Sequence, residues 1–238
     1  MKTLKVLSAL LSYPQPEMQA ALGEMADVLA RENLLPAREY SALLALMNRL
    51  ASTPLMTLQE QYVASFDRGR ALSLYLFEHV YGESRDRGQA MVNLLEAYRQ
   101  HGFALNAREL PDYIPLFLEY LAQRPGGEAL DSLTDAMHVM TLIGARLTER
   151  GNDYHVVFDA LAALVGEPAD IEDIRRQAAT EGPDETVVNM DKIWEEEAVT
   201  FLATGQEGCG ANRNLPGGTP QPVQWVQRPG STPQPARS

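Results

Sequence analysis

The side chains that could do chemistry in this chain are few and scattered. The sequence contains four histidines, His79, His101, His138 and His155, and a single cysteine, Cys209. A serine or cysteine nucleophile needs a base beside it, but the cysteine lies in a Gly- and Pro-rich end and no GxSxG sequence is present. A glycine-rich phosphate loop and a dinucleotide fingerprint are also missing. The sequence therefore predicts no catalytic residues.

Two pairs of side chains have a spacing that suits metal ligands on one helix face. His79 and Glu83 are four positions apart, and Asp135 and His138 are three apart. A di-metal carboxylate bundle needs two Glu-x-x-His pairs and two further glutamates, whereas this chain offers one weak match with aspartate in place of glutamate. We interpret His138 as a partly buried structural residue. His79 shares an apolar face, so it is either a hydrogen-bonded core residue or part of a pocket lining. A single cysteine excludes Cys-based zinc or iron–sulfur ligation within one chain, and no metal site is predicted.

The charge balance narrows the class of partner. The chain carries 32 acidic and 20 basic residues, a formal net charge of −12. Such a surface repels phosphate backbones, so we expect no nucleic-acid partner. It favours a basic partner, although acidity also serves solubility alone.

Several sequence features predict the subcellular compartment. No stretch approaches the roughly 20 apolar residues of a membrane-spanning helix. The N-terminal apolar run is short and ends at Pro14, so we interpret it as a first helix and not as an export signal. With a single cysteine, which suits a reducing compartment, these features predict a cytoplasmic protein without direct membrane insertion.

Apolar residues recur at the period of an α-helix through most of the sequence. The β-branched residues are scattered among Leu, Ala, Met and Glu, which favour helix, and no alternating run with hairpin turns appears. We predict an all-α fold, with a single compact bundle of roughly ten helices over residues 1–203. Residues 204–238 are punctuated by Gly and Pro and have little to bury, so we expect a disordered C-terminal tail.

The segment 72–120 differs from the rest. Two stretches in it, 72–81 and 117–121, are apolar around most of a helix circumference, and such helices belong at the centre of a fold. Glycine and proline interrupt them, and a dense group of charges borders them. Pro115 has no N–H to donate, so the chain must bend there or begin a new helix with Asp112 as a nearby cap. We therefore predict a core that opens onto a groove with a polar rim.

Four phrases of the sequence carry a family resemblance. They are FDRGR (66–70), LFEHVYGESRDRGQAM (76–91), RELPDYIPLFLEYL (108–121) and WEEEAVTF (194–201). In this order they resemble the nitrate reductase delta-subunit family, the chaperones for assembly of respiratory nitrate reductase. Two departures stand out. Tyr113 occupies the place of the histidine in the Glu-x-Pro-Asp-His hallmark of more distant relatives, and Tyr81 stands where family members often carry histidine. The roles of those histidines do not transfer to this chain.

The resemblance implies an all-helical chaperone without catalytic activity that is not part of the finished enzyme. Such proteins bind the N-terminal leader of the apo catalytic (alpha) subunit, which looks like a remnant twin-arginine signal. They act on the alpha–beta assembly intermediate before membrane attachment, and they assist insertion of the molybdenum bis-guanine-dinucleotide cofactor without stably binding a cofactor themselves. Proteins of molybdenum cofactor biosynthesis are further candidate partners. A chaperone of another molybdoenzyme, a helical metal-dependent enzyme and a structural subunit of the membrane complex stay open as alternatives.

An acidic chaperone and a basic, amphipathic leader suggest a helix-in-groove mode of binding. The apolar face of the leader would lie on side chains of the segment 72–120. Carboxylates of that segment would pair with arginines, which suit bidentate contacts. The predicted peptide-binding residues are Leu72, Tyr75, Leu76, Glu78, His79, Val80, Arg87, Met91, Glu109, Asp112, Leu116, Glu119 and Tyr120.

Overall fold

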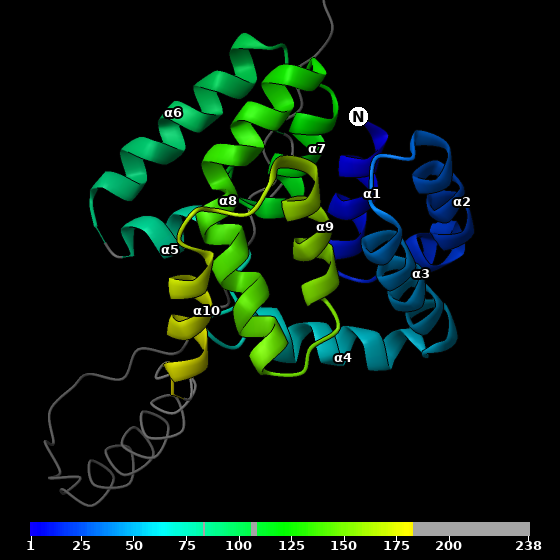
Figure 1. Ribbon diagram of the computed structural model, residues 1–238. Coiled ribbons are helices and arrows are strands. Elements are labelled where there is room, and N and C mark those ends of the chain that lie inside the picture. Colours follow the sequence, from blue (N-terminus) through cyan, green and yellow to red (C-terminus); the bar gives the residue numbers. More distant parts are fainter. Residues whose placement is uncertain (83, 106–108, 183–238) are drawn as a thin grey trace, which may run out of the picture. The chain divides into compact units, whose positions relative to one another are not determined.

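The computed structural model describes residues 1–82, 84–105 and 109–182, all within one compact unit, Met1–Glu195. The predicted domain end at residue 203 and the predicted tail 204–238 lie outside the described residues. In the described part of the chain there are ten α-helices and one isolated β-bridge, which confirms the all-α prediction. The helices (Figure 1) are α1 (Lys2–Leu11), α2 (Pro16–Glu32), α3 (Ala37–Ser52), α4 (Leu55–Phe66), α5 (Leu76–Tyr81), α6 (Asp86–Gln100), α7 (Ile114–Ala122), α8 (Gly126–Glu149), α9 (His155–Val165) and α10 (Ile171–Thr180).

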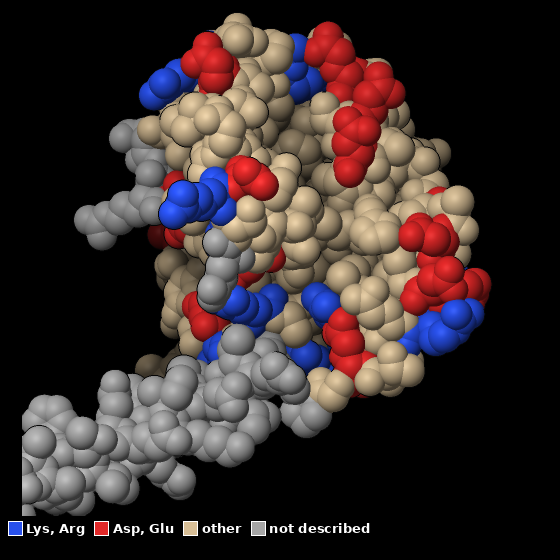
Figure 2. All heavy atoms as spheres, turned by 90° about the vertical axis from the view of Figure 1, so that its left-hand side faces the viewer, with Lys and Arg blue, Asp and Glu red and all other residues tan. Residues whose placement is uncertain are grey.

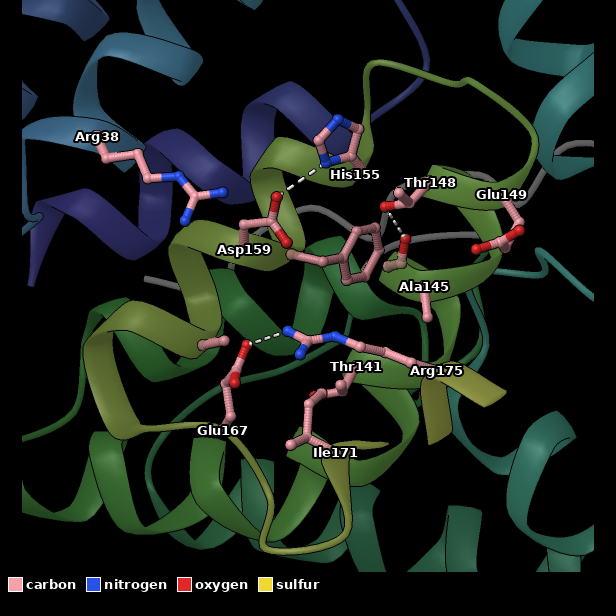
Figure 3. A pocket seen from close by; sticks show the side chains of 13 residues that line it. Arg38, Thr141, Ala145, Thr148, Glu149, His155, Asp159, Glu167, Ile171 and Arg175 are labelled. Carbon is pink, nitrogen blue, oxygen red and sulfur yellow. Dashed lines mark hydrogen bonds and ion pairs between the residues drawn. The ribbon is translucent and has the colours of Figure 1, made fainter. Parts of the chain in front are cut away.

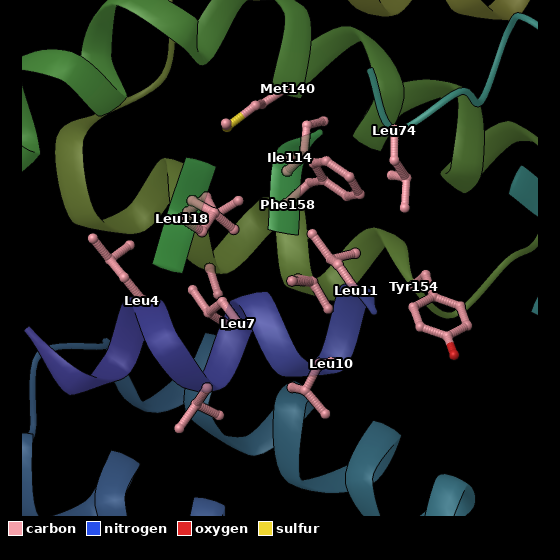
Figure 4. Packing of buried hydrophobic residues seen from close by; sticks show 14 of the residues in the cluster. Leu4, Leu7, Leu10, Leu11, Leu74, Ile114, Leu118, Met140, Tyr154 and Phe158 are labelled. Carbon is pink, nitrogen blue, oxygen red and sulfur yellow. The ribbon is translucent and has the colours of Figure 1, made fainter. Parts of the chain in front are cut away.

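Helix α1 lies in the middle of the core. Its leucines Leu4, Leu7, Leu10 and Leu11 recur at helical spacing and are fully buried. Helix α1 packs along α7 and also contacts α2 and α9, while α8 packs along α9 and α10. Figure 4 shows the α1 leucines facing side chains of α7 and the ring of Phe158 in α9. One apolar interior therefore joins the N-terminal helices to those that follow residue 113.

Residues 72–75 are not helical: the chain turns at Leu72 and is extended at Tyr75, so the prediction of a helix that begins at Leu72 is wrong for this stretch. The N–H of Leu76 donates to the carbonyl of Asp112 at 3.0 Å, and the N–H of Ile114 donates to the carbonyl of Leu74 at 2.8 Å. Apolar side chains on every side indicate burial, but they do not distinguish a buried helix from a buried extended chain. Hydrogen bonds to the distant residues Asp112 and Ile114 set the conformation of this stretch.

Helix α7 begins anew beside its proline. Ile114 is its first residue and Pro115 lies in the first turn, where the missing N–H costs no helical hydrogen bond. The second of the two arrangements predicted for Pro115 is therefore the one observed. No side chain caps α7. The carboxylate of Asp112 instead accepts a hydrogen bond from the N–H of Phe77 in α5, with Oδ2 3.1 Å away.

Candidate functional site

Two segments, 72–82 and 109–120, meet in the part of the chain that the sequence singles out, and we refer to them as the seam. Tyr75 and Tyr113 form an antiparallel β-bridge between them, with ring centroids 5.4 Å apart. The hydroxyl of Tyr113 lies 3.0 Å from the hydroxyl of Tyr62 in α4. The seam is thus held to itself and to the core through backbone and side chains.

Asp112 is the most deeply buried charged group of the seam, with no exposed surface. Its Oδ2 accepts from the N–H of Phe77, while its Oδ1 is buried without a hydrogen-bond partner. Burial raises the pKa of Asp112, and the N–H of Phe77 and the positive charge of Arg87 offset only part of this rise. Arg87 is thus close enough for its charge to act on the Asp112 carboxylate. In this conformation Asp112 braces the start of α5 and presents no surface to a peptide.

Glu78 and His79 face inward to a polar network under the seam. Ser73 Oγ donates to Glu78 Oε2 at 2.5 Å, and Arg70 Nε lies 3.6 Å from Glu78 Oε1. His79 Nε2 is 2.8 Å from the carbonyl of Ser73, and Arg146 Nη1 is 3.4 Å from His79 Nδ1. Burial and the charge of Arg146 lower the pKa of His79, although the Ser73 carbonyl acts in the opposite direction. Of the two interpretations of His79, the structure supports the hydrogen-bonded structural one.

Helix α6 is anchored to the seam near its C-terminal end. The hydroxyl of Tyr98, the one buried residue of α6, donates to the carbonyl of Pro111 at 2.8 Å. The Tyr98 ring lies 4.5 Å from the ring of Tyr120 in α7, centroid to centroid. The Tyr120 hydroxyl in turn lies 2.8 Å from His101 Nδ1. Met91, in the middle of α6, is only half-buried, so this helix leaves part of its apolar surface uncovered.

Exposed apolar side chains gather in this part of the chain. Of the seven large apolar side chains that are exposed among the described residues, four lie within residues 80–110: Val80, Tyr81, Val92 and Leu110. Figure 2 faces the side of the molecule on which Figure 1 places α5, α6 and α10. It shows charged groups in separate small clusters, with a wide uncharged area between them. These four side chains are close to one another in the sequence, and contiguous apolar exposure is what marks surfaces that bind partners.

The thirteen residues predicted to bind a peptide differ widely in exposure. Leu72, Leu76 and Asp112 are buried. The intermediate group comprises Tyr75, Glu78, His79, Arg87, Met91, Leu116 and Tyr120, and the exposed group comprises Val80, Glu109 and Glu119. Leu72 and Leu76, on either side of the β-bridge at Tyr75, place their side chains in the core. They therefore anchor the seam to the apolar interior. The assignment of this region to peptide binding stays a prediction.

Of the two pairs whose spacing suits metal ligands, only Asp135 and His138 lie wholly within the described residues. His138 is exposed and not partly buried as expected, and its Nδ1 lies 3.4 Å from Asp170 Oδ2 at the start of α10. Glu83 lies outside the described residues. No group of three or more His, Cys, Asp or Glu side chains converges among the residues described.

Two of the clefts among the described residues differ in composition. One, of about 210 Å³, lies against the seam and is lined by Tyr13, Tyr62, Phe66, Asp67, Leu74, Tyr75, Glu109 and Tyr113. Another, of about 280 Å³, lies among α3, α8, α9 and α10 (Figure 3). In this cleft His155 Nδ1 lies 2.8 Å from Asp159 Oδ2, and Arg175 Nη2 lies 2.7 Å from Glu167 Oε1. The cleft at the seam is lined instead mainly by aromatic rings and carboxylates.

The predicted peptide-binding set omitted six residues of the seam cleft: Tyr13, Tyr62, Phe66, Asp67, Leu74 and Tyr113. Phe66 and Asp67 belong to the FDRGR phrase, and Leu74 and Tyr113 lie in the segment 72–120, so the sequence held usable signals for these four. Tyr13 and Tyr62 come from other parts of the chain and had no local signal that would join them to the seam. One further observation concerns the whole described region: none of its helices is both long enough and apolar enough to cross a lipid bilayer.

Comparison with known proteins defines the class. The family model "Nitrate reductase delta subunit" matches residues 14–160. The nitrate reductase molybdenum cofactor assembly chaperone NarJ of Escherichia coli K12 is 45% identical over 87% of this chain and 87% of its own. The probable assembly chaperone NarW of the same organism is 40% identical over 88% and 87%, and the probable NarJ of Bacillus subtilis is 32% identical over 68% and 88%.

The fold and the comparisons together place this chain among chaperones and not among enzymes. It belongs to the nitrate reductase delta-subunit family. The resemblance drawn from the four sequence phrases is thereby confirmed.

Proposed function

We propose that the protein is a dedicated chaperone for the apo catalytic (alpha) subunit of respiratory nitrate reductase, and that it binds the N-terminal leader of that subunit. Binding in the cytoplasm would hold the alpha–beta intermediate until the molybdenum bis-guanine-dinucleotide cofactor is inserted, before attachment to the membrane. The observation that carries the proposal is 45% identity over 87% of both chains with a protein named as a nitrate reductase molybdenum cofactor assembly chaperone.

The surface of the seam supports leader binding. Tyr75, Leu116 and Tyr120 are partly exposed and Val80 is exposed, so they offer apolar contacts to an amphipathic helix. Glu109 and Glu119 are exposed carboxylates on the same segment. They could pair with arginines of a basic leader, in keeping with the formal charge of −12.

A peptide titration tests the docking surface. A synthetic peptide with the client's leader sequence would be titrated calorimetrically into the wild type, into Val80→Glu and into Met56→Glu. Val80 is 57% exposed on α5 and Met56 is 73% exposed at the start of α4, so both changes put a charge on an exposed apolar side chain. We expect Val80→Glu to weaken binding about tenfold or more, because a charge would be buried under the apolar face of the peptide. Met56→Glu should bind like the wild type. Equal affinity of all three proteins would move the docking surface away from α5.

A pull-down tests the client. The tagged protein would be isolated from cells that cannot make the molybdenum cofactor and from cells that can. Recovery of the apo alpha subunit mainly from the cofactor-free cells would agree with the proposal. Recovery of the mature, cofactor-loaded complex instead would favour a structural subunit, and stoichiometric iron, manganese or zinc in the purified protein would favour the metal-dependent enzyme.

A further inference from the structure

The cleft beside the seam is an aromatic box. Tyr62 and Phe66 of α4 are buried at its base, with ring centroids 4.9 Å apart. Tyr13, which follows α1 and is 39% exposed, stands edge-on to Tyr62 with centroids 5.5 Å apart. Tyr75 joins the lining from the seam. Aromatic faces carry negative potential and attract cations placed over them within about 6 Å.

Two carboxylates complete the cleft and repel one another. Asp67 comes directly after α4 and Glu109 comes from the seam, and both are exposed. The hydroxyl of Tyr75 donates to Glu109 Oε2 at 2.7 Å, which orients that carboxylate. Burial, and then the negative charge of Glu109, raise the pKa of Asp67. Since the two acids disfavour each other's charge, a cation between them would relieve the repulsion.

Among the residues that the structure describes, the lining of the cleft supplies no cation to do this. None of the described residues that line it is lysine or arginine. Three of the tyrosine hydroxyls are already hydrogen-bonded, since Tyr75 donates to Glu109 and the Tyr62 hydroxyl, which donates to the carbonyl of Leu11 at 2.8 Å, lies 3.0 Å from the hydroxyl of Tyr113. The rings and the carboxylates are therefore what a ligand would meet.

The size and chemistry of the cleft select one kind of group. Its volume of about 210 Å³ is below the range of roughly 300–1,000 Å³ that holds drug-sized ligands, so it suits the end of one side chain. A guanidinium group is planar, stacks on aromatic faces and gives bidentate hydrogen bonds to carboxylates. An ammonium group is more strongly hydrated and has no flat face.

We propose that the cleft lined by Tyr13, Tyr75, Asp67 and Glu109 binds the guanidinium group of an arginine in the client's N-terminal leader. This inference rests on the proposed function for the source of the arginine, but the cleft can be tested without the client. An arginine bound in the cleft would give the seam a polar anchor next to the apolar docking surface, and so fix the position of the leader along the seam.

The first experiment uses the leader peptide and its arginine→citrulline analogues, in which each arginine is replaced in turn by its uncharged isostere. They would be titrated into the wild type, into Asp67→Asn/Glu109→Gln, and into Glu17→Gln/Glu24→Gln. The last variant removes two exposed carboxylates from α2 and thus matches the change in net charge. Circular dichroism would check that all three proteins are equally folded.

We expect one citrulline substitution to weaken binding to the wild type about tenfold. It should have the same effect on the α2 control and no further effect on Asp67→Asn/Glu109→Gln, since the partner carboxylates are already gone. If the citrulline penalty persists in full in that variant, the arginine is bound elsewhere; the inference is then wrong while leader binding stands.

The second experiment removes the client. N-acetylargininamide, N-acetylcitrullinamide and N-acetyllysinamide would be titrated into the full-length protein at low salt, with NMR detection of the Tyr13 and Tyr75 rings. Shifts with the arginine compound that exceed those with the lysine compound, and no shifts with the citrulline compound, are expected. This result would keep the guanidinium site even if the leader peptide failed to bind. If none of the three moves the rings, the site does not exist.

Discussion

Replacing Tyr98 by phenylalanine should loosen α6 while leaving its ring packing in place. The change removes one oxygen, the hydroxyl that donates to the carbonyl of Pro111 at 2.8 Å in a buried site. The ring would remain against Tyr120, whose centroid lies 4.5 Å away. What is lost is therefore one hydrogen bond at the contact between α6 and the seam.

The size of the loss follows from the burial of the acceptor. Pro111 is buried, so its carbonyl would be left without a donor, at a cost of about 1–3 kcal/mol of unfolding free energy. In a domain of this size each kcal/mol corresponds to a fall in melting temperature of about 2–4 °C. Urea unfolding should show a lower midpoint with an unchanged slope, and amide hydrogen exchange should accelerate in residues 86–100 more than elsewhere.

Tyr81→Phe serves as the matched control. Tyr81 also packs its ring on a neighbour, Phe77, at 5.6 Å between centroids, but it is 36% exposed. Because the side chain is exposed, the control should change the unfolding free energy by less than about 0.5 kcal/mol. If Tyr98→Phe proved as stable as Tyr81→Phe, with unchanged exchange in α6, the reasoning that this bond anchors the helix would be refuted.

Two further predictions concern the frame around the site. Glu32→Gln should lower the unfolding free energy by about 1 kcal/mol at neutral pH, because Glu32 accepts hydrogen bonds from the first N–H groups of α1 at 2.7 and 2.6 Å. Burial alone would raise the pKa of Glu32, but these bonds lower it below its ordinary value. The stabilisation is thus present above the pKa of the unfolded chain and lost as pH falls through the folded-state value. Urea titrations over a pH series should show the difference shrinking in acid, and a difference that grew there would contradict this view. Gly144→Ala would bring a Cβ within 2.8 Å of the Phe158 Cβ where α8 crosses α9, and thermal unfolding should show a loss of about 1–3 kcal/mol. Gly23→Ala, with open space around it in α2, should be neutral or stabilising; equal melting temperatures for the two alanine variants would rule out a tight crossing.

Helices could be predicted well where apolar residues repeat along one face. The α1 leucines and the first-turn proline of α2, Pro16, lie where the pattern indicated. The pattern failed at 72–75, because Tyr75 forms a β-bridge with Tyr113, 38 residues further along the chain, and the helix begins only after it. His138 was likewise misjudged, since a neighbouring helix offered Asp170 outside the core.

In the candidate site, too, the sequence predicted some features and missed others. Sequence phrases drew attention to the seam, to Glu109 and to the FDRGR segment, and helical spacing suggested a continuous face with Leu72 and Leu76. The bridge at Tyr75 interrupts that spacing, so those two leucines are buried while Val80 and Glu109 are exposed. Which of the predicted residues contact a peptide stays a prediction for the titrations above.

The sequence by itself determined the family and the all-helical architecture, because long phrases that resemble the family and a repeated 3.6-residue period are properties of neighbours along the chain. Only the tertiary structure decided which seam residues face outward and which lie in the core. It also assembled the aromatic cleft, whose Tyr13 and Glu109 are 96 positions apart in the sequence. Pairing between distant segments is settled by packing and backbone hydrogen bonds, and no local pattern of residue types records it.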